Sequence, residues 1–587
     1  MSVDELVPEP AKRAGVFAVV PKAFLSGVCL TVLFWVFFND RLTATPGLEW
    51  LPRIRLRMEF NSFPFMLLFV PATFGLYAVA RGTRAANWVL VLASLGIYAT
   101  VGAIYLIPLL FTCFFDYVTG AFLARSTHDR LRKAAFVVSV AVQLTLLCTF
   151  KYAGWLSDEF NTASAALGLG VAVTQFAVPL PPGISFYTFH TISYTADIYL
   201  RKFKPTGTFV DYVTFVAFFP QLIAGPIARA SELLPQVARR RPAVSPEECE
   251  RAFTLIAWGL FKKTCLADNL GLVVTQTGLA ALQSGGSGLG YVYMYAFAGQ
   301  IYCDFSAYTD IARGLAKLFG IELTRNFLTP YLSRSPSDFW QRWHISLSRW
   351  LRDYLYIPLG GNHYGRLKTL RNLAITMFLG GLWHGAGFGF IVWGLYHGLL
   401  LILYRLLPID ELLRQRLGKL GSVLAIVLMF NLVCIGWIFF RATSAELWPL
   451  FSSLLAVPSI ESHGVLLWGL ALFGFPIVVT ELLAYRCGVE FVDLLDRLSW
   501  PARAILYILL FYAIVFFAAR SQSEFIYFQF LVSARRPGPH RCYRDRLFRD
   551  RSFFACRTCR LSEFQFQLQG VLPQDSNSGK ARQRHPR

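Results

Sequence analysis

Long apolar runs recur along most of this sequence, separated by short polar and basic segments. A run of about 17–25 apolar residues is long enough for a helix to cross a hydrocarbon core of roughly 30 Å. The clearest runs are Val16–Phe38, Phe63–Ala80, Ala86–Thr112, Ala134–Trp155, Phe209–Ala224, Ala374–Leu400, Leu420–Phe440, Gly464–Ala484 and Ala504–Ala518. More polar runs, which predict further crossings or buried helices, are Asn161–Val178, Ile184–Leu200, Ala252–Val274 and Val292–Leu318. The pattern predicts an all-α polytopic membrane protein with about 11–13 transmembrane helices.

The same pattern divides the chain into three parts. Residues 1–59 form an N-terminal extension with one extra transmembrane helix, and residues 60–530 carry the main hydrophobic block. Residues 531–587 contain thirteen Lys or Arg against four acids and show neither a helical nor a strand period. We expect this basic tail to be disordered and without a catalytic role, and its composition resembles a shifted reading frame or an unrelated extension.

Composition supports a membrane location and a definite orientation. The chain is 55% hydrophobic and only 16% charged, which leaves too little polar surface for a soluble fold. A net charge of +21 could indicate nucleic acid, but in a membrane protein Lys and Arg gather in cytoplasmic loops. Two basic segments, Gln236–Lys263 and Arg334–Arg371, are therefore expected to face the cytoplasm. We predict a multi-pass protein of the cell inner membrane, in contact with lipid and with no nucleic acid partner.

Local signals mark two helix boundaries and one unusual segment. Ser245-Pro-Glu-Glu248 has the residues of a capping box, so a helix should begin there. Pro179–Gly183 holds three prolines and a glycine, which predicts a turn or a break at membrane depth. Pro336–Gly361 mixes aromatic and charged residues densely. It suits either the wall of a wet cavity or an amphipathic helix at the membrane interface.

The histidines supply the candidate chemistry. His384 lies in a run from Ala374 to Tyr404 without Asp, Glu, Lys or Arg, and glycines flank it. An ionisable group in such a span is a functional-site candidate by default. His344, in the aromatic and basic segment, is the second candidate, whereas His190 and His397 fit a packing role better.

A neutral imidazole can take a hydroxyl proton, as transfer of an acyl group to an alcohol requires. Arg342, Trp343 and Trp383 are candidate donors to the developing oxyanion. The sequence contains no Gly-x-Ser-x-Gly or Ser-x-x-Lys motif, which favours direct transfer over a covalent serine intermediate. It also lacks a His-Glu-x-x-His motif, so we predict no metal site.

Ordered motifs between about Phe60 and Phe530 resemble those of alginate O-acetyltransferases in the membrane-bound O-acyltransferase (MBOAT) superfamily. The stretches that carry the resemblance are Phe219–Pro226, Gln300–Asp310, Asn326–Leu332, Asp338–Ser348, Arg352–Asn362, Gly381–Gly385 and the closing Phe525–Phe530.

The resemblance implies a ring of transmembrane helices around a central funnel. By motif, His384 is the essential histidine and His344 its partner, and the funnel is lined by Trp343, Trp383, Arg342, Asp338, Asp304 and Asn326. The implied reaction passes an acetyl group from a cytoplasmic donor across the membrane for O-acetylation of an exported, alginate-like polysaccharide. No tightly bound cofactor is expected. The donor would be acetyl-CoA or an acyl-carrier thioester, and the partners a periplasmic acetyltransferase and a polysaccharide synthase complex.

Three other functions remain open at this point. A related branch of the superfamily transfers D-alanine to teichoic acid. A secondary transporter would use a buried histidine as a proton relay, but such transporters tend to show repeated halves, which we do not find here. A non-catalytic membrane scaffold would have no need for an uncharged span hollowed around a histidine.

Overall fold

The computed structural model describes residues 25–26, 28–33, 37, 60–175, 178–205, 207–284, 288–455, 460–519 and 525–526. Within these residues the chain is helical and contains no strand, which confirms the predicted fold class. Nearly all of the predicted N-terminal extension and the whole basic tail lie outside the described residues, so the boundaries at residues 60 and 530 stay predictions.

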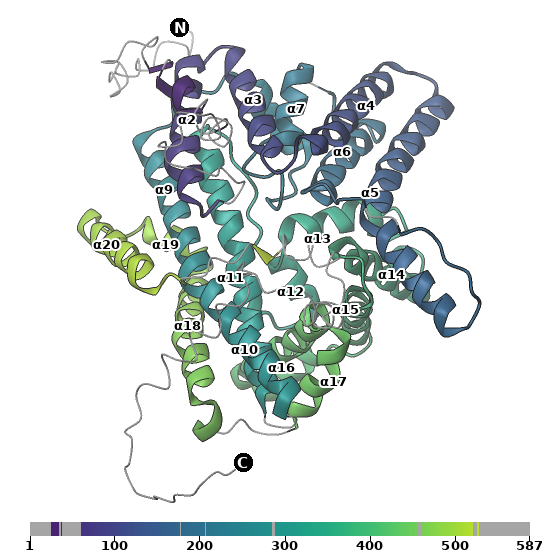
Figure 1. Ribbon diagram of the computed structural model, residues 1–587, viewed down its shortest axis with the longest axis vertical. Helices are drawn as coiled ribbons and strands as arrows, with labels where there is room; N and C mark the ends of the chain where they lie inside the picture. The colour runs from purple at the N-terminus through teal and green to yellow at the C-terminus, as the bar shows by residue number, and fades with distance from the viewer. Residues whose placement is uncertain are drawn as a thin grey trace, which may run out of the picture. The chain divides into compact units, whose positions relative to one another are not determined.

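The helices follow one another in three groups, which Figure 1 colours from purple to yellow. The first group is η3 (Pro64–Phe69), α2 (Val70–Ala80), α3 (Ala85–Ala99), η4 (Ala103–Tyr105), α4 (Leu106–Arg125), α5 (Asp129–Ala166), α6 (Ile184–Tyr199), α7 (Phe209–Ala217) and α8 (Ala230–Ala238). The second is α9 (Pro246–Phe261), η5 (Lys262–Ala267), α10 (Asp268–Ser284), α11 (Leu289–Leu318), η6 (Pro330–Leu332), α12 (Pro336–Arg342), α13 (Ile345–Leu351) and η7 (Arg352–Tyr356). The third is α14 (Arg366–His384), α15 (Phe388–Leu406), α16 (Ile409–Arg441), α17 (Ser444–Ser453), α18 (Ile460–Cys487), α19 (Phe491–Leu495) and α20 (Trp500–Phe517).

Several of these helices are long and apolar enough to cross a membrane, and the chain is a multi-pass membrane protein. Among the described residues the candidate spans are Ala103–Arg125, Asp129–Ala166, Phe388–Leu406, Ile409–Arg441, His463–Cys487 and Trp500–Phe517. Two shorter apolar helices cover Pro64–Ala80 and Ala85–Ala99. The total of about 11–13 crossings stays a prediction.

Four of the predicted apolar runs are not continuous helices. The run Ala86–Thr112 is divided between α3 and α4, and Phe209–Ala224 stops being helical after α7, just before Pro220. The run Asn161–Val178 loses its helix after α5, where Gly168 and Gly170 adopt positive φ. Ala374–Leu400 is divided between α14 and α15. In each case the apolar residues continue beyond the position at which the backbone leaves the helix.

The predicted boundary signals around α6 and α9 are confirmed. Ser245 accepts a hydrogen bond from the backbone N–H of Glu248, and the Glu248 carboxylate accepts one from the backbone N–H of Ser245. The proline-rich segment ends at Gly183, whose φ of 77° is left-handed, and α6 begins at the next residue. A side chain at Gly183 would collide with the Leu222 carbonyl oxygen, so only glycine fits there.

Helix α11 is the buried centre of the described chain. It packs against α9 and against α10, which continues from α9 through η5, and Figure 1 shows α11 running beside both. Two large apolar clusters form most of the core, and a small third cluster lies around Trp258. The first draws on helices from η3 to α9 and on the second half of α11 and includes Trp383, whereas the second draws on α10, the first half of α11, α16 and α18 and includes Trp343 and Trp393. The segments that carry His344 and His384 therefore lie where the two clusters meet.

Two lysines assigned to a cytoplasmic loop by charge pattern are instead buried. Lys263 is 0% exposed and its Nζ lies 2.7 Å from Asp304 and 2.9 Å from Asp268. Lys262 is 6% exposed and lies 2.7 Å from Asp310. Their charges are compensated inside the protein, so they do not contribute to an exposed basic loop.

Candidate active site

His384 is the last residue of α14, immediately before a short non-helical segment. The three residues after it, Gly385 to Gly387, are non-helical, and α15 begins at Phe388. The uncharged run around His384 is thus a hairpin of two helices, and the histidine lies at its turn. At this position the residue is partly exposed, whereas full burial is expected in a continuous span.

Glycines allow the two helices of this hairpin to approach closely. A methyl group on Gly381 would lie 2.3 Å from the Phe390 carbonyl oxygen and 3.0 Å from the Cα of Gly394. A methyl group on Gly385 would lie 2.1 Å from the Phe390 ring. These glycines therefore set how closely α15 packs beside His384, which is a more specific role than clearing space around it.

We expect Gly381→Ala to lower both stability and activity, because backbone atoms of α15 cannot move aside for the new methyl group. Overpacking of this kind costs about 1–3 kcal/mol. Gly387→Ala is the matched control, since its methyl group would come no closer than 3.8 Å to the Phe390 ring. Thermal midpoints and acetyl transfer of the two purified variants check this. Equal midpoints would contradict the close-approach argument.

Lys151 and Tyr152 of α5 hold the end of α14 in place. The Lys151 Nζ donates to the Trp383 carbonyl oxygen and, at 3.1 Å, to the Ser185 hydroxyl. The Tyr152 hydroxyl donates to the Leu382 carbonyl oxygen at 2.6 Å. Carbonyls at a helix C-terminus lack partners within the helix, and a cation there also interacts favourably with the helix dipole. The residue before His384 is therefore fixed from outside its own helix.

Lys151 was missed at the level of sequence, although a signal was present. It is a lone lysine inside the apolar run Ala134–Trp155, and a charged residue in such a run marks a functional site by default. The Lys151 ammonium lies 5.7 Å from the centre of the Trp383 ring. Lys151 therefore lies beside the same indole ring as His384 and His344.

Aromatic rings surround the His384 imidazole. Its ring centre lies 5.0 Å from that of Trp393, 5.1 Å from that of Trp383 and 5.2 Å from that of Phe440. The ring centre of Trp383 also lies 6.0 Å from that of His344. Trp383 is thus in contact with both candidate histidines, and the structure brings them together around this indole.

His344 occupies a strained backbone position. Its φ of 42° and ψ of 55° are left-handed, which is uncommon for a residue other than glycine. Asn326 maintains this turn through two hydrogen bonds. Its carbonyl oxygen accepts from the Ile345 N–H at 2.9 Å, and its Oδ1 accepts from the Ser346 N–H at 3.1 Å. Asn326, predicted to line the funnel, thus positions the backbone around His344.

The His344 side chain is buried beside the ring of Phe305, with ring centres 4.7 Å apart. Neither ring nitrogen forms a hydrogen bond to another described residue. Burial lowers the pKa of His344 to about 3, so this imidazole is neutral at cellular pH. Unpaired nitrogens in a strained, buried turn are costly, which is typical of a residue kept for function.

The remaining predicted residues lie on both sides of His344. The Arg342 Nε donates to Asp338 at 2.6 Å, and its NH1 donates to Thr329 at 2.9 Å, so this guanidinium supports the turn before the histidine. Trp343 is buried among aromatic rings, 4.9 Å from Trp437 between ring centres. These side chains are packed or paired, and their predicted role as oxyanion donors is not tested by this arrangement.

Asp304, also predicted to line the funnel, binds Lys263 and the C-terminal segment instead. Its Oδ1 accepts from Lys263, and its Oδ2 accepts from the backbone N–H of Ile526 at 2.7 Å. Both carboxylate oxygens therefore have partners within the protein. The aspartate fastens the C-terminal Phe525–Ile526 segment to α11, one residue before the Phe305 ring that contacts His344.

A basic cavity of about 490 Å³ opens beside the helix that follows His344. It lies among α12, α13, η7 and α14, and its lining includes Trp340, Ile345 and Met377 together with Arg325, Arg349 and Arg352. Arg352 pairs with Asp353, whereas Arg325 and Arg349 have no carboxylate within 4 Å among the described residues. The aromatic and basic segment thus forms a cavity wall, one of the two alternatives that its composition allowed.

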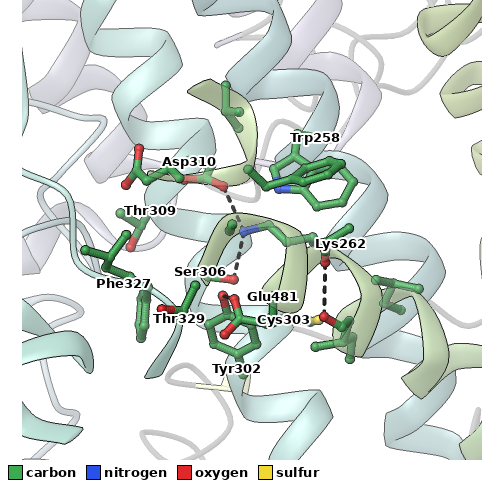
Figure 2. A pocket seen from close by; sticks show the side chains of 18 of the residues that line it. Trp258, Lys262, Tyr302, Cys303, Ser306, Thr309, Asp310, Phe327, Thr329 and Glu481 are labelled. Carbon is green, nitrogen blue, oxygen red and sulfur yellow. Dashed lines mark hydrogen bonds and ion pairs between the residues drawn. The ribbon is translucent and has the colours of Figure 1, made fainter. Parts of the chain in front are cut away.

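A second, smaller polar cavity of about 60 Å³ lies between η5, α11 and α18. Figure 2 shows Lys262 pointing to Asp310 and Ser306 within it, with Tyr302 and Glu481 nearby. The Tyr302 hydroxyl donates to Glu481 at 2.5 Å. No sequence motif singled out Glu481, because its partners come from distant segments. Among the described residues no group of side chains could hold a metal ion.

Several known proteins are similar to this chain in sequence. Residues 97–407 match the model of the MBOAT family, described as the membrane-bound O-acyltransferase family. A protein of Pseudomonas aeruginosa named probable alginate O-acetylase AlgI is 38% identical over 68% of this chain and 75% of its own length. The corresponding protein of Pseudomonas putida is 35% identical over 81% of this chain and 100% of its own. A peptidoglycan O-acetyltransferase of Helicobacter pylori is 33% identical over 66% of this chain and 77% of its own.

Proposed function

Because the chain belongs to the membrane-bound O-acyltransferase family, we propose that it passes an acetyl group from a cytoplasmic thioester donor toward an exported, alginate-like polysaccharide, with His384 as general base. The protein is an O-acyltransferase. The observation that carries the finer proposal is the meeting of His384, His344 and Lys151 around Trp383, beside a basic cavity.

The chemistry requires a base, a donor held close and a stabilised oxyanion. In the proposed reaction, the acceptor hydroxyl attacks the thioester carbon while His384 takes the hydroxyl proton. The new C–O bond forms and the C–S bond breaks. The leaving thiolate then takes the proton from His384 and departs as a thiol. Lys151, whose ammonium lies 5.7 Å from the centre of the Trp383 ring that contacts His384, supplies positive charge where negative charge develops. Its bond to the Trp383 carbonyl also holds the base in position.

The proposed donor is acetyl-CoA or an acyl-carrier thioester, and both carry phosphate. Arg325 and Arg349 are exposed and line the cavity whose wall includes Ile345, the residue after His344. Arginine binds phosphate through two parallel hydrogen bonds. An anionic carrier held there would extend its thioester arm inward, toward the histidines. The inner membrane location, the periplasmic acetyltransferase partner and the polysaccharide synthase complex are part of the same proposal.

The test in cells is complementation of a strain that lacks this protein. Expression of the wild-type chain should restore acetyl groups on the exported polysaccharide, measured by ester hydrolysis and chromatography of the released acid. If a D-alanyl ester were restored in place of an acetyl ester, the transferred group would be D-alanine and not acetyl. Unchanged polysaccharide in a strain that accumulates the protein would refute it.

We expect Arg349→Gln and Arg325→Gln to raise the KM for the donor about five- to tenfold with little change in kcat, because they remove uniform binding. Arg366→Gln is the matched control, since Arg366 is exposed in the same basic segment but does not line the cavity. Initial rates in isolated membranes at varied donor concentration separate the two constants. An equal effect of all three substitutions would indicate a general charge effect instead of a donor site.

A further inference from the structure

A third cavity lies far along the chain from the residues of the active site. It measures about 430 Å³ and is formed by the loop between α2 and α3, the start of α7 and the end of α8. We call it the α3–α8 cavity. Four arginines line it against a single acid, and the lining residues used below are Arg84, Arg239, Arg240, Arg241, Asp211 and Trp88.

Arg241 is the buried part of this site. It is 5% exposed, and its guanidinium donates to the Tyr77 hydroxyl at 2.8 Å, the Val237 carbonyl oxygen at 3.0 Å and the Asn87 Oδ1 at 2.6 Å. All of these acceptors are neutral, and no carboxylate lies within 4 Å of Arg241 among the described residues. A buried cation without an anionic partner is costly, so its charge remains available to an anion.

Asp211, the one acid among the residues that line the cavity, already accepts hydrogen bonds through both carboxylate oxygens. Its Oδ2 accepts from the backbone N–H of Thr208 at 2.7 Å in the capping box of α7, and its Oδ1 accepts from the Asn87 Nδ2 at 2.6 Å. Asn87 thus stands between Asp211 and Arg241. The carboxylate neutralises the arginine only through this amide, which leaves the cavity strongly positive.

The other three arginines add charge at the opening. Arg84, Arg239 and Arg240 are exposed, and none has a carboxylate within 4 Å in the part of the chain that the structure describes. They come from two different loops, so they converge on the cavity through the fold and not through one run of sequence. A phosphate group at the opening would meet several guanidinium groups at once.

The surface beside the opening indicates which kind of phosphate compound fits. Trp88 and Leu92 lie one turn apart on α3, and they are 52% and 63% exposed. Tryptophan and arginine together are typical of the headgroup level of a membrane. An apolar strip on a short apolar helix, leading away from a basic cavity, matches a lipid tail below a headgroup. A soluble phosphate has no acyl chain that could contact this strip.

We propose that the α3–α8 cavity binds the phosphate headgroup of an anionic glycerophospholipid, with the acyl chains along Trp88 and Leu92 of α3. The inference is independent of the acyl transfer proposed above. It gives the basic segment around Arg239–Arg241 a specific ligand, beyond its contribution to orientation. Cytoplasmic leaflets carry negative surface charge, which attracts such a segment.

The test is native mass spectrometry of the purified protein with phosphatidylglycerol or phosphatidylcholine of identical acyl chains. Wild-type protein should retain phosphatidylglycerol at least tenfold better than phosphatidylcholine. Each arginine near an anionic headgroup contributes about fivefold, so Arg239→Gln/Arg240→Gln should lose about tenfold or more. Arg84→Gln, on the other loop, repeats the test with an independent change and should lose about fivefold.

The matched control is Arg416→Gln/Lys419→Gln, which removes two exposed cations from α16 and should leave retention unchanged. Thermal midpoints of all variants establish that they are folded. Equal retention of the two lipids, or equal losses in the control, would overturn the proposal. Competition by inorganic phosphate or glycerol 3-phosphate at the lipid's own concentration would also overturn it, because the site would then bind a free anion.

Discussion

Replacement of His384 by alanine should reduce acetyl transfer to background, whereas His344→Ala should be strongly impaired yet measurably active. His384 lies at the turn of the α14–α15 hairpin among Trp383, Trp393 and Phe440, whose rings cannot take a proton from a hydroxyl group. Loss of general-base catalysis costs about 10²–10⁴ in rate. The ring centre of His344 lies 6.0 Å from that of Trp383, and a bound water could partly replace its imidazole.

Both variants should be compared by radiolabelled acetyl transfer in membranes that contain equal amounts of each protein, with any required periplasmic partner present. His344→Gln serves as a second variant, because it keeps a polar side chain in the strained turn that Asn326 maintains. If His384→Ala retains more activity than His344→Ala, the roles of the two histidines are exchanged.

Removal of the chain after Ala519 should prevent stable folding, whereas removal after Phe530 should have no effect. The difference lies in Phe525 and Ile526, which are 3% and 1% exposed and belong to the two different apolar clusters. Phe525 lies 4.5 Å from the Lys263 ammonium, and the Ile526 N–H donates to Asp304. Their loss would leave a cavity in place of the Phe525 ring and remove the Ile526 N–H from Asp304, which would keep only Lys263 as a partner. We expect this to lower the free energy of unfolding by about 3–5 kcal/mol.

Membrane accumulation and thermal midpoints of the two shortened chains measure this difference. Phe525→Ala in the full chain is the corresponding point variant and should lower the midpoint in the same direction. A chain ended after Ala519 that folds as well as the full protein would show that this C-terminal contact is dispensable. Loss of activity on ending the chain after Phe530 would show instead that the basic tail has a function.

The fold class could be predicted from the sequence because an apolar run of span length has few alternatives to a membrane helix. The exact helices could not, and the reasons are local. Apolar composition continues through Gly168, Pro220 and Gly385, yet the backbone there leaves the helix. A hydropathy pattern records burial, whereas a helix end depends on one or two residues with special backbone preferences.

The candidate site was predictable to the extent that its residues belong to motifs. His384, His344 and Trp383 are brought together as expected. Asp304 and Asn326 instead hold the backbone and the C-terminal segment through hydrogen bonds that depend on tertiary contacts. Lys151 reaches the site from α5, 232 residues away from the carbonyl that it binds, and no local pattern encodes such a contact.

In the proposed reaction one acetyl group crosses from a cytoplasmic donor to an acceptor on the other side through the His384 site. The most direct measurement uses proteoliposomes of known orientation, with radiolabelled donor on one side and polysaccharide acceptor with its partner on the other. We predict labelled acetyl ester on the acceptor only when the donor is on the side of the basic cavity lined by Arg325 and Arg349. The His384→Ala variant should give no labelled ester from either side. Equal labelling from either side, or labelling by His384→Ala, would contradict the account.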